Sequence, residues 1–189
     1  MTTPHDTDLI SVLTQDHREV EEMFAELERI GTGDLERRQK LTEKVIIELV
    51  RHSVAEEAYL YPAARELLPD GDEIADRELA EHAEAEKTMK HLEEIDVKDA
   101  EHVTALNRLM REVRQHVQEE EFELFPQLRR HATSERLAEL GEKVEAIKDL
   151  APTRPHPATP QSPTAQKLLG PLTGLVDRMR DTISGRGKD

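Results

Sequence analysis

Hydrophobic residues recur every three or four positions over four long stretches of the chain, the spacing that gives an α-helix one apolar face. These stretches cover about residues 7–30, 34–68, 72–95 and 96–131, and a shorter stretch covers residues 134–150. Turn-forming residues separate them, with GTG at 31–33 and PDG at 69–71, while Asp34 and Asp96 are good helix N-caps. Because short connections make successive helices antiparallel neighbours, the sequence predicts an all-α fold: an up-down-up-down antiparallel four-helix bundle with a short fifth helix.

The composition changes after residue 150. Residues 151–166 hold five prolines, which cannot continue a helix, so this segment is expected to be an extended linker. Residues 167–189 carry apolar side chains at helical spacing with Arg178 and Arg180 on the other side, which predicts a short amphipathic helical tail. We therefore divide the chain into a bundle domain (1–150), a Pro-rich linker (151–166) and a helical tail (167–189).

Histidine and glutamate interrupt the apolar helix faces at regular places. Two segments read HSVAEEAYLYP (52–62) and HVQEEEFELFP (116–126), each with a His, a Glu four residues later, a second Glu and an aromatic–Pro pair. The first and third helices also carry a His with a Glu one turn later, which gives the pairs His17/Glu21, His52/Glu56, His82/Glu86 and His116/Glu120. A carboxylate is almost never buried without a partner, so four such pairs on inward faces indicate a shared site.

The four histidines are predicted to lie at one level of the bundle. In an antiparallel hairpin, residues at equal distances from the loop lie side by side. The midpoint between His17 and His52 falls beside the loop at 31–34, and the next two midpoints, 67 and 99, fall near the following two breaks. The spacing from the first His to the third is 65 residues and from the second to the fourth 64, which indicates two related hairpins and a pseudo-twofold site.

A core cluster of four imidazoles and several carboxylates points to two metal ions. The chain has no cysteine, so any metal must be held by nitrogen and oxygen. Imidazole suits borderline metals, and carboxylates can bridge two ions and offset their charge, which favours iron, with manganese as the alternative. The His-x-x-x-Glu spacing differs from the Glu-x-x-His spacing of ferritin-type bundles. A structural bundle with incidental histidines is the remaining interpretation.

These residues resemble the hemerythrin-like, or HHE cation-binding, domain family. The resemblance covers about residues 8–131 and rests on His17, HSVAE (52–56), EHAEAE (81–86) and HVQEE (116–120), with EEAYLYP and EEFELFP in the two longer motifs. It implies a non-haem di-iron centre in which Glu56 and Glu120 bridge or chelate the metal. The resemblance places His17, His52, Glu56, His82, His116 and Glu120 at matching ligand positions, and we add Glu86, one turn after His82, to the expected metal ligands.

Oxygen-carrying members of the family place a second histidine one turn after the third-helix histidine, where this chain has Glu86. A site richer in carboxylates is expected to favour ferric iron and redox turnover over reversible O2 carriage. The expected partner is a small oxidant (O2, H2O2 or nitric oxide), in oxidative or nitrosative stress or in iron handling. The alternative is a non-catalytic iron-buffering or iron-sensing module with the tail as an interaction element, and the sequence does not decide whether the chain is an enzyme.

Several neighbours of these residues have two interpretations. Glu57 and Glu121, the second Glu of each repeated motif, are expected either in solvent or hydrogen-bonded to a ligand histidine. Glu21 is a candidate for the same role or for a ligand. Because Phe125 takes the place of Tyr61 in the second motif, we expect Tyr61 to pack in the core. The proline of each motif is expected to bend its helix beyond the site.

The net charge of −15 is distributed unevenly. Residues 1–150 carry 20 Lys and Arg against 38 Asp and Glu, and residues 151–189 carry 6 against 3. Nucleic acid binding needs basic surface, so no nucleic acid partner is expected. No segment reaches the roughly 18 apolar residues of a membrane span, and the tail has few Lys and Arg, which disfavours a membrane partner and predicts a cytoplasmic protein. The tail is expected to dock onto the bundle or to bind a protein partner.

Overall fold

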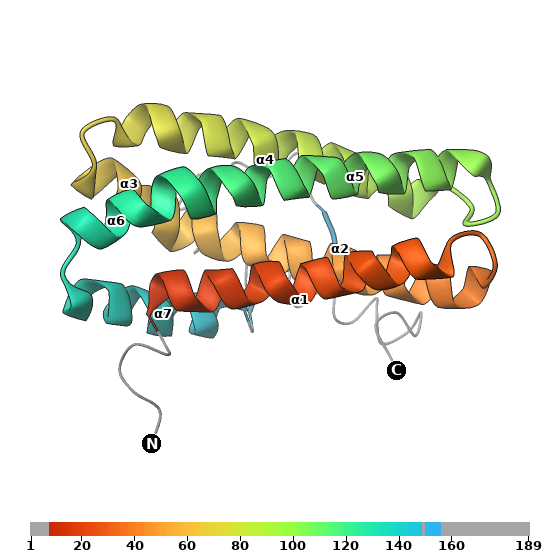
Figure 1. Cartoon of the computed structure of the whole chain (residues 1–189), viewed down its shortest axis with the longest axis horizontal. Helices are drawn as coiled ribbons and strands as arrows, with labels where there is room; N and C mark the ends of the chain where they lie inside the picture. Colours follow the sequence, from red (N-terminus) through yellow and green to blue (C-terminus); the bar gives the residue numbers. More distant parts are fainter. Residues whose placement is uncertain (1–7, 149, 156–189) are drawn as a thin grey trace, which may run out of the picture.

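A computed structural model describes residues 8–148 and 150–155, and this part of the chain contains helices and turns but no strand. Its helical segments are α1 (Leu9–Ile30), α2 (Leu35–Ala55), η1 (Glu56–Leu60), α3 (Tyr61–Leu67), α4 (Gly71–Glu94), α5 (Ala100–Glu119), η2 (Glu120–Leu124), α6 (Phe125–His131) and α7 (Ser134–Lys148). The segments α2, η1 and α3 form one continuous rod, as do α5, η2 and α6 (Figure 1). The described chain therefore folds as four long antiparallel rods and a short fifth helix, which confirms the predicted all-α fold.

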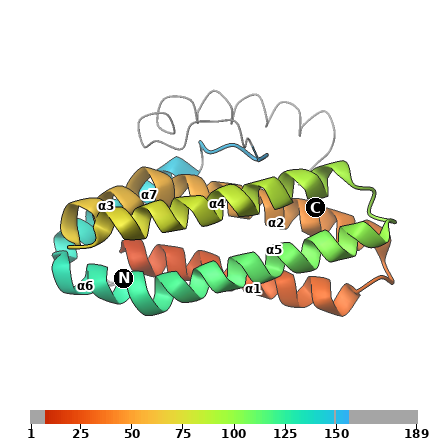
Figure 2. The ribbon, with the colours of Figure 1, turned by 90° about the horizontal axis from the view of Figure 1, so that it is seen from above.

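The four rods are arranged as two hairpins. α1 packs against α2, α4 packs against α5, and Figures 1 and 2 show the loops of both hairpins at the same end of the bundle. α7 packs against α1, α2 and η1 of the first hairpin. None of the helices in the described part of the chain is long and apolar enough to cross a membrane.

Two apolar clusters lie at different levels of the bundle and leave a polar layer between them. One cluster includes Leu13 and Leu60 and extends to α7. The other includes Val20 and Leu109 and lies toward the hairpin loops. On every long rod a buried histidine lies between residues of one cluster and residues of the other. The packing of the apolar stripes thus sets the depth of the polar layer.

The helix starts agree with the predicted caps at one position and differ at another. Asp34 is the N-cap of α2, because its side chain accepts a hydrogen bond from the backbone N–H of Arg37 at 3.0 Å. The predicted start of the fourth helix at Asp96 is wrong, since α5 begins at Ala100. Asp96 instead accepts a hydrogen bond from the backbone N–H of Lys98 at 2.9 Å and so stabilises the preceding turn.

Each copy of the repeated motif contains a π-helical turn. In η1 the N–H of Tyr61 donates to the carbonyl of Glu56, and in η2 the N–H of Phe125 donates to the carbonyl of Glu120, five residues back rather than four. The next residue in each rod is a proline, which has no N–H to continue the regular helical ladder. The wider turn adds one residue and changes the direction of the side chains that follow. The sequence predicted an effect of the prolines beyond the site but did not predict these turns.

The first residues of the predicted linker pack against the bundle. Ala151 and Thr153 are buried, and Nη1 of Arg154 lies 3.4 Å from Oε1 of Glu93 on α4. The rest of the linker and the predicted helical tail, residues 156–189, lie outside the described residues. The division of the chain into three parts stays a prediction.

Gly71 permits a close contact between α3 and the start of α4. A Cβ atom at this position would lie 2.0 Å from the carbonyl oxygen of Ala64 and 2.8 Å from Cα of Arg65. Both of these atoms belong to the backbone, which cannot rotate away as a flexible side chain can. The second loop therefore requires glycine here for steric reasons.

We predict that Gly71→Ala lowers the free energy of unfolding by at least about 2 kcal/mol, because the backbone must move to accept the methyl group. The matched control is Gly33→Ala in the first loop, where an added Cβ meets no atom closer than 3.6 Å. The control is expected to change the free energy of unfolding by less than about 1 kcal/mol. Urea unfolding followed by circular dichroism measures both, and equal midpoints for the two variants would contradict the account of this loop.

Candidate metal centre

Four buried imidazoles face one another in two pairs within the polar layer. Nε2 of His17 on α1 lies 3.2 Å from Nε2 of His52 on α2, and Nε2 of His82 on α4 lies 3.1 Å from Nε2 of His116 on α5. None of the four residues is more than 7% exposed. The fold thus brings the histidines of both hairpins to one level, in agreement with the loop midpoints.

A carboxylate holds the outer nitrogen of each ring. The Nδ1–oxygen distances are 2.9 Å (His17–Glu121), 3.3 Å (His52–Asp16), 3.2 Å (His82–Glu57) and 3.1 Å (His116–Glu81). A neutral ring that donates its Nδ1–H to a carboxylate keeps its lone pair on Nε2, so the lone pairs point into the space between the rings. Metal-binding histidines have this orientation. Glu57 and Glu121 take one of the two roles expected for them, whereas the two carboxylates that directly precede a histidine were not predicted.

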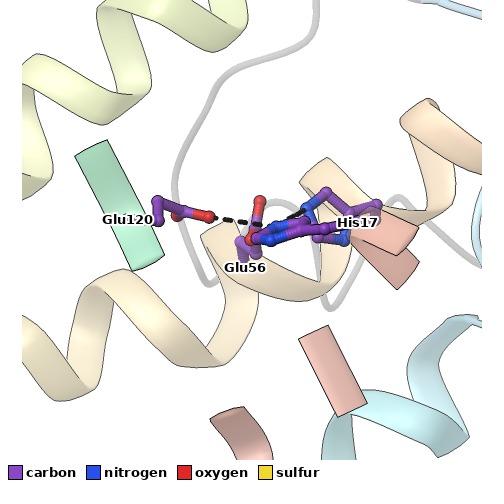
Figure 3. A group of neighbouring side chains, drawn as sticks. His17, Glu56 and Glu120 are labelled. Atoms are coloured by element: carbon purple, nitrogen blue, oxygen red, sulfur yellow. Dashed lines mark hydrogen bonds and ion pairs between the residues drawn. The ribbon is translucent and has the colours of Figure 1, made fainter. Parts of the chain in front are cut away.

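Glu56 and Glu120 begin the two π-turns and reach both histidine pairs. Each places an oxygen near Nε2 of one ring in each pair, at 3.0 Å (His52–Glu56), 3.3 Å (His82–Glu56), 3.4 Å (His17–Glu120) and 3.7 Å (His116–Glu120). Both side chains are fully buried. Figure 3 shows His17, Glu56 and Glu120 pointing toward one another from three separate segments. Each carboxylate therefore lies within reach of both histidine pairs and would be available to a cation held between them.

The two carboxylates lack the hydrogen bonds that their burial requires. Both oxygens of Glu56 and Oε2 of Glu120 are shielded from water and accept no hydrogen bond of normal geometry. Burying a carboxylate without compensation costs several kcal/mol or more, and a bound cation removes that cost. The donor set of imidazole nitrogen and carboxylate oxygen suits borderline divalent metals. These residues therefore fit the cations that the family resemblance implies.

Six of the seven predicted ligands fall into three overlapping groups whose donor atoms lie within 4.8 Å of one another. The groups are His17, His52, Glu56 and Glu120; Glu56, His82 and His116; and Glu78, His116 and Glu120. Glu56 and Glu120 each belong to two groups. This sharing is the pattern expected for two adjacent metal positions connected by carboxylates.

Glu86, the seventh predicted ligand, is half-buried on α4 and belongs to none of the groups found among residues 8–148 and 150–155. Neighbouring rods are antiparallel, so a step of four residues moves one way along α2 or α5 and the opposite way along α1 or α4. Glu86 therefore lies one turn from His82 on the side away from the shared carboxylates. Glu21 has the same placement on α1 and binds Arg114 at 2.7 Å. A ligand role for Glu86 stays a prediction from the sequence.

Glu78 is a candidate ligand that the sequence analysis missed. It is fully buried on α4, one turn before His82, with Oε2 3.0 Å from Nδ1 of His116 and Oε1 2.9 Å from Arg77. The repeat spacing places Leu13 at the equivalent position of the first hairpin. The signal that would have found Glu78 is the reversed spacing Glu-x-x-x-His, which an antiparallel helix requires to reach the same side of the histidines.

The hydroxyl group of Tyr61 also enters the site. Its Oη lies 2.9 Å from Nε2 of His82 and donates to Oε1 of Glu120 at 3.2 Å. Burial and the surrounding carboxylates, Glu120 first among them, raise the pKa of Tyr61 well above its usual value, so the hydroxyl keeps its proton. In the first hairpin's half of the site, the ring of Phe125 stacks on His17 with centroids 5.8 Å apart. The expected core role of Tyr61 was therefore incomplete.

The buried carboxylates also set the charge of the histidines in the metal-free chain. Burial alone would lower the pKa of His52, but Glu56 and Asp16 raise it to about 10. Burial likewise opposes the charge of His116, but Glu120 and other carboxylates raise its pKa well above the usual value. Burial works against the ionised form of Glu56, yet His52 and His116 hold its pKa well below the usual range. Burial and the charge of Glu56 raise the pKa of Glu120. A metal ion that binds here must displace protons.

Comparison with known proteins agrees with this geometry. Residues 8–128 match the hemerythrin HHE cation binding domain. The chain is 26% identical over 178 residues to an uncharacterized hemerythrin-like protein of Schizosaccharomyces pombe, a match that covers 94% of this chain and 87% of that protein. It is 28% identical over 145 residues to a DNA nickase of Nostoc sp., a match that covers 76% of this chain and 40% of the nickase. No solved structure matches the chain significantly.

The family match covers most of the bundle and includes both copies of the repeated motif. The buried histidines and glutamates that it spans form the candidate metal groups. Sequence comparison and geometry thus lead to the same conclusion. The chain belongs to the hemerythrin HHE cation-binding domain family.

Proposed function

We propose that the chain holds a non-haem di-iron centre that reacts with a small oxidant: O2, H2O2 or nitric oxide. The observation that carries this proposal is the placement of two fully buried carboxylates, Glu56 and Glu120, within reach of two histidine pairs. Imidazole with bridging carboxylate suits iron, with manganese as the alternative. Iron bound here would supply Lewis acidity and electrons. We assign this reaction to the cytoplasm and to oxidative or nitrosative stress or iron handling.

The side chains around the site orient the proposed ligands and supply a proton. The outer carboxylates fix the orientation of the four rings, and apolar clusters pack against the layer on both sides. Oη of Tyr61 holds a proton beside His82 and Glu120, where it can donate a hydrogen bond to an oxidant. The nickase activity of the Nostoc relative is not part of the proposal, because the net charge of −15 opposes binding to phosphates.

An outer carboxylate provides a test that leaves all the proposed metal ligands in place. We predict that Glu57→Gln weakens iron binding by about 10-fold to 100-fold, because the amide no longer carries the charge that orients His82. Glu123→Gln is the matched control, since Glu123 lies in the other π-turn, η2, with a side chain 60% exposed. Anaerobic iron titration of both variants measures the difference. Equal affinities would show that the outer carboxylate does not support the metal.

The raised pKa of His52 predicts that metal binding depends on pH. Its folded-state value of about 10 exceeds the ordinary value of 6.5, so the charged ring stabilises the metal-free fold below pH 6.5. This contribution is lost as pH rises toward 10. Iron affinity must change in the opposite direction, because only the deprotonated ring can bind metal. We therefore expect the melting temperature of the metal-free chain to fall, and iron affinity to increase, between pH 6.5 and 10. Proton release in a weakly buffered titration checks the linkage, and metal uptake without proton release would refute it.

Turnover is the direct test of the proposed reaction. Supplied with an excess of an external reductant that returns the oxidised iron to the ferrous state, the iron-loaded chain is expected to consume at least one of the three oxidants over many cycles. An oxygen electrode follows O2, a colorimetric peroxide assay follows H2O2, and a nitric oxide electrode follows nitric oxide. His52→Ala should lose both iron and turnover, because it removes a proposed ligand. His91→Ala is the control and should keep both, since the side chain of His91 is 50% exposed on α4.

Two results would contradict this proposal. A single stoichiometric oxidation of the iron without further turnover would instead support a non-catalytic iron-binding module. Equal uptake and release of O2 through repeated cycles would instead support reversible carriage.

A further inference from the structure

We propose that the chain binds an uncharged, largely apolar organic molecule in a cavity that leads from the metal centre to the surface between α4 and α5. One part of this inference rests on the proposed function, namely that the ligand lies beside a metal centre. The cavity has a volume of 420 Å³, and all four histidines of the site line it. Its inner wall is formed by the buried apolar residues Val20, Leu49, Met89 and Val113.

The volume of the cavity exceeds what the oxidant requires. O2, H2O2 and nitric oxide are each comparable in size to a water molecule, which occupies about 30 Å³ in the liquid. Cavities of about 300–1,000 Å³ with apolar walls and a few polar groups typically bind organic molecules. A small oxidant beside the histidines would leave most of the 420 Å³ free. The geometry therefore accommodates a second, larger ligand.

The cavity opens between two sets of contacts that connect α4 to α5. On the side of the metal centre, Glu81 contacts Nδ1 of His116 at 3.1 Å. On the side of the loops, the hydroxyl of Thr88 donates to Glu112 at 3.0 Å. At the equivalent place of the first hairpin, Lys148 of α7 covers Asp16, and the side chain of Asp16 is 12% exposed. The side chain of Glu81 is 28% exposed. The asymmetric packing of α7 thus leaves the second hairpin accessible.

The charges around the cavity select against anions. The carboxylates among its lining residues are Asp16, Glu81, Glu84 and Glu112, and the guanidinium groups are Arg77 and Arg108. Both arginines are already paired with glutamates, at 2.9 Å for Arg77 and Glu78 and at 2.6 Å for Arg108 and Glu112. The four histidines of the lining are likewise each paired with a carboxylate. An anionic ligand would therefore meet this acidic lining without an unpaired cation, while the apolar inner wall disfavours any charged group. An uncharged ligand satisfies both conditions.

Fluorescence titration of the full-length chain tests the inference. The neutral probe is N-phenyl-1-naphthylamine, and its anionic relative is 1-anilinonaphthalene-8-sulfonate. We expect one saturable site for the neutral probe and binding at least about 10-fold weaker for the anionic probe, a difference of about 1.4 kcal/mol or more. Ala85→Phe places a bulky ring in the cavity, because Ala85 is half-buried on α4 and lines it. This variant should weaken binding of the neutral probe by at least about 10-fold.

A second variant and a control keep the test decisive. Ala80 is exposed and also lines the cavity, so Ala80→Trp should obstruct the opening with little risk to folding. The matched control is Ala138→Phe, at a half-buried alanine of α7 that is outside the lining. Circular dichroism verifies that each variant is folded. If Ala85→Phe does not fold, the result for Ala80→Trp decides the test. The inference is overturned if folded wild type shows no saturable binding, if folded lining variants bind the neutral probe as well as the control does, or if the anionic probe binds equally tightly.

The metal content of the same samples separates this inference from the proposed function. Saturable probe binding by a chain that takes up no iron would sustain the ligand cavity and remove the di-iron proposal. Iron uptake by a chain that does not bind the probe would overturn the cavity inference alone. The titration is therefore performed on both the metal-free and the iron-loaded chain.

Discussion

Two carboxylates buried beyond the reach of water are the constraint on which the rest of this bundle depends. Glu56 and Glu120 have no exposed surface, and most of their oxygens accept no hydrogen bond. Such groups are tolerated only beside positive charge, either protonated histidines or metal cations. The four histidines meet this requirement only because both hairpins deliver them to one level. The apolar clusters on either side set that level.

The pseudo-twofold repeat explains why the site has two similar halves, and its exceptions explain how the halves differ. Each half has a histidine pair, a fully buried glutamate and outer carboxylates. Glu78 faces His116 in one half, whereas the equivalent residue in the other is Leu13. Tyr61 brings a hydroxyl to His82 where Phe125 brings only a ring to His17. Two metal positions in this site would therefore differ in charge and in hydrogen bonding.

Long helices and inward histidines could be predicted because both follow from local periodicity. The apolar stripes indicate which face of each helix is buried, and the loop midpoints indicate depth, so the four histidines required no further information. The π-turns could not be predicted because a proline within a helix can accompany either a bend or a wider turn. The start of α5 was misplaced because an aspartate can stabilise a turn as well as a helix start.

The gaps in the predicted site have a different origin. The rule of four residues that suggested Glu86 holds along one helix, but the direction of that step reverses on the antiparallel neighbour. Glu86 therefore lies away from the shared carboxylates, and its ligand role stays a prediction. Glu78 was not predicted for the same reason, because it lies four residues before its histidine rather than four residues after it. Asp16, Glu81 and the Tyr61 hydroxyl make contacts across helices, and such contacts depend on side-chain directions that periodicity does not specify. The sequence could therefore predict the chemistry of the site but not its full set of contacts.

We propose above all that Glu56 and Glu120 would hold two metal ions in one centre. The most direct measurement is the iron content per chain combined with the electron paramagnetic resonance spectrum of the ferric protein. We expect two iron ions per chain and no signal from isolated high-spin ferric iron, because bridged ions are magnetically coupled. One iron per chain, or two irons that give the spectrum of isolated ions, would contradict this proposal.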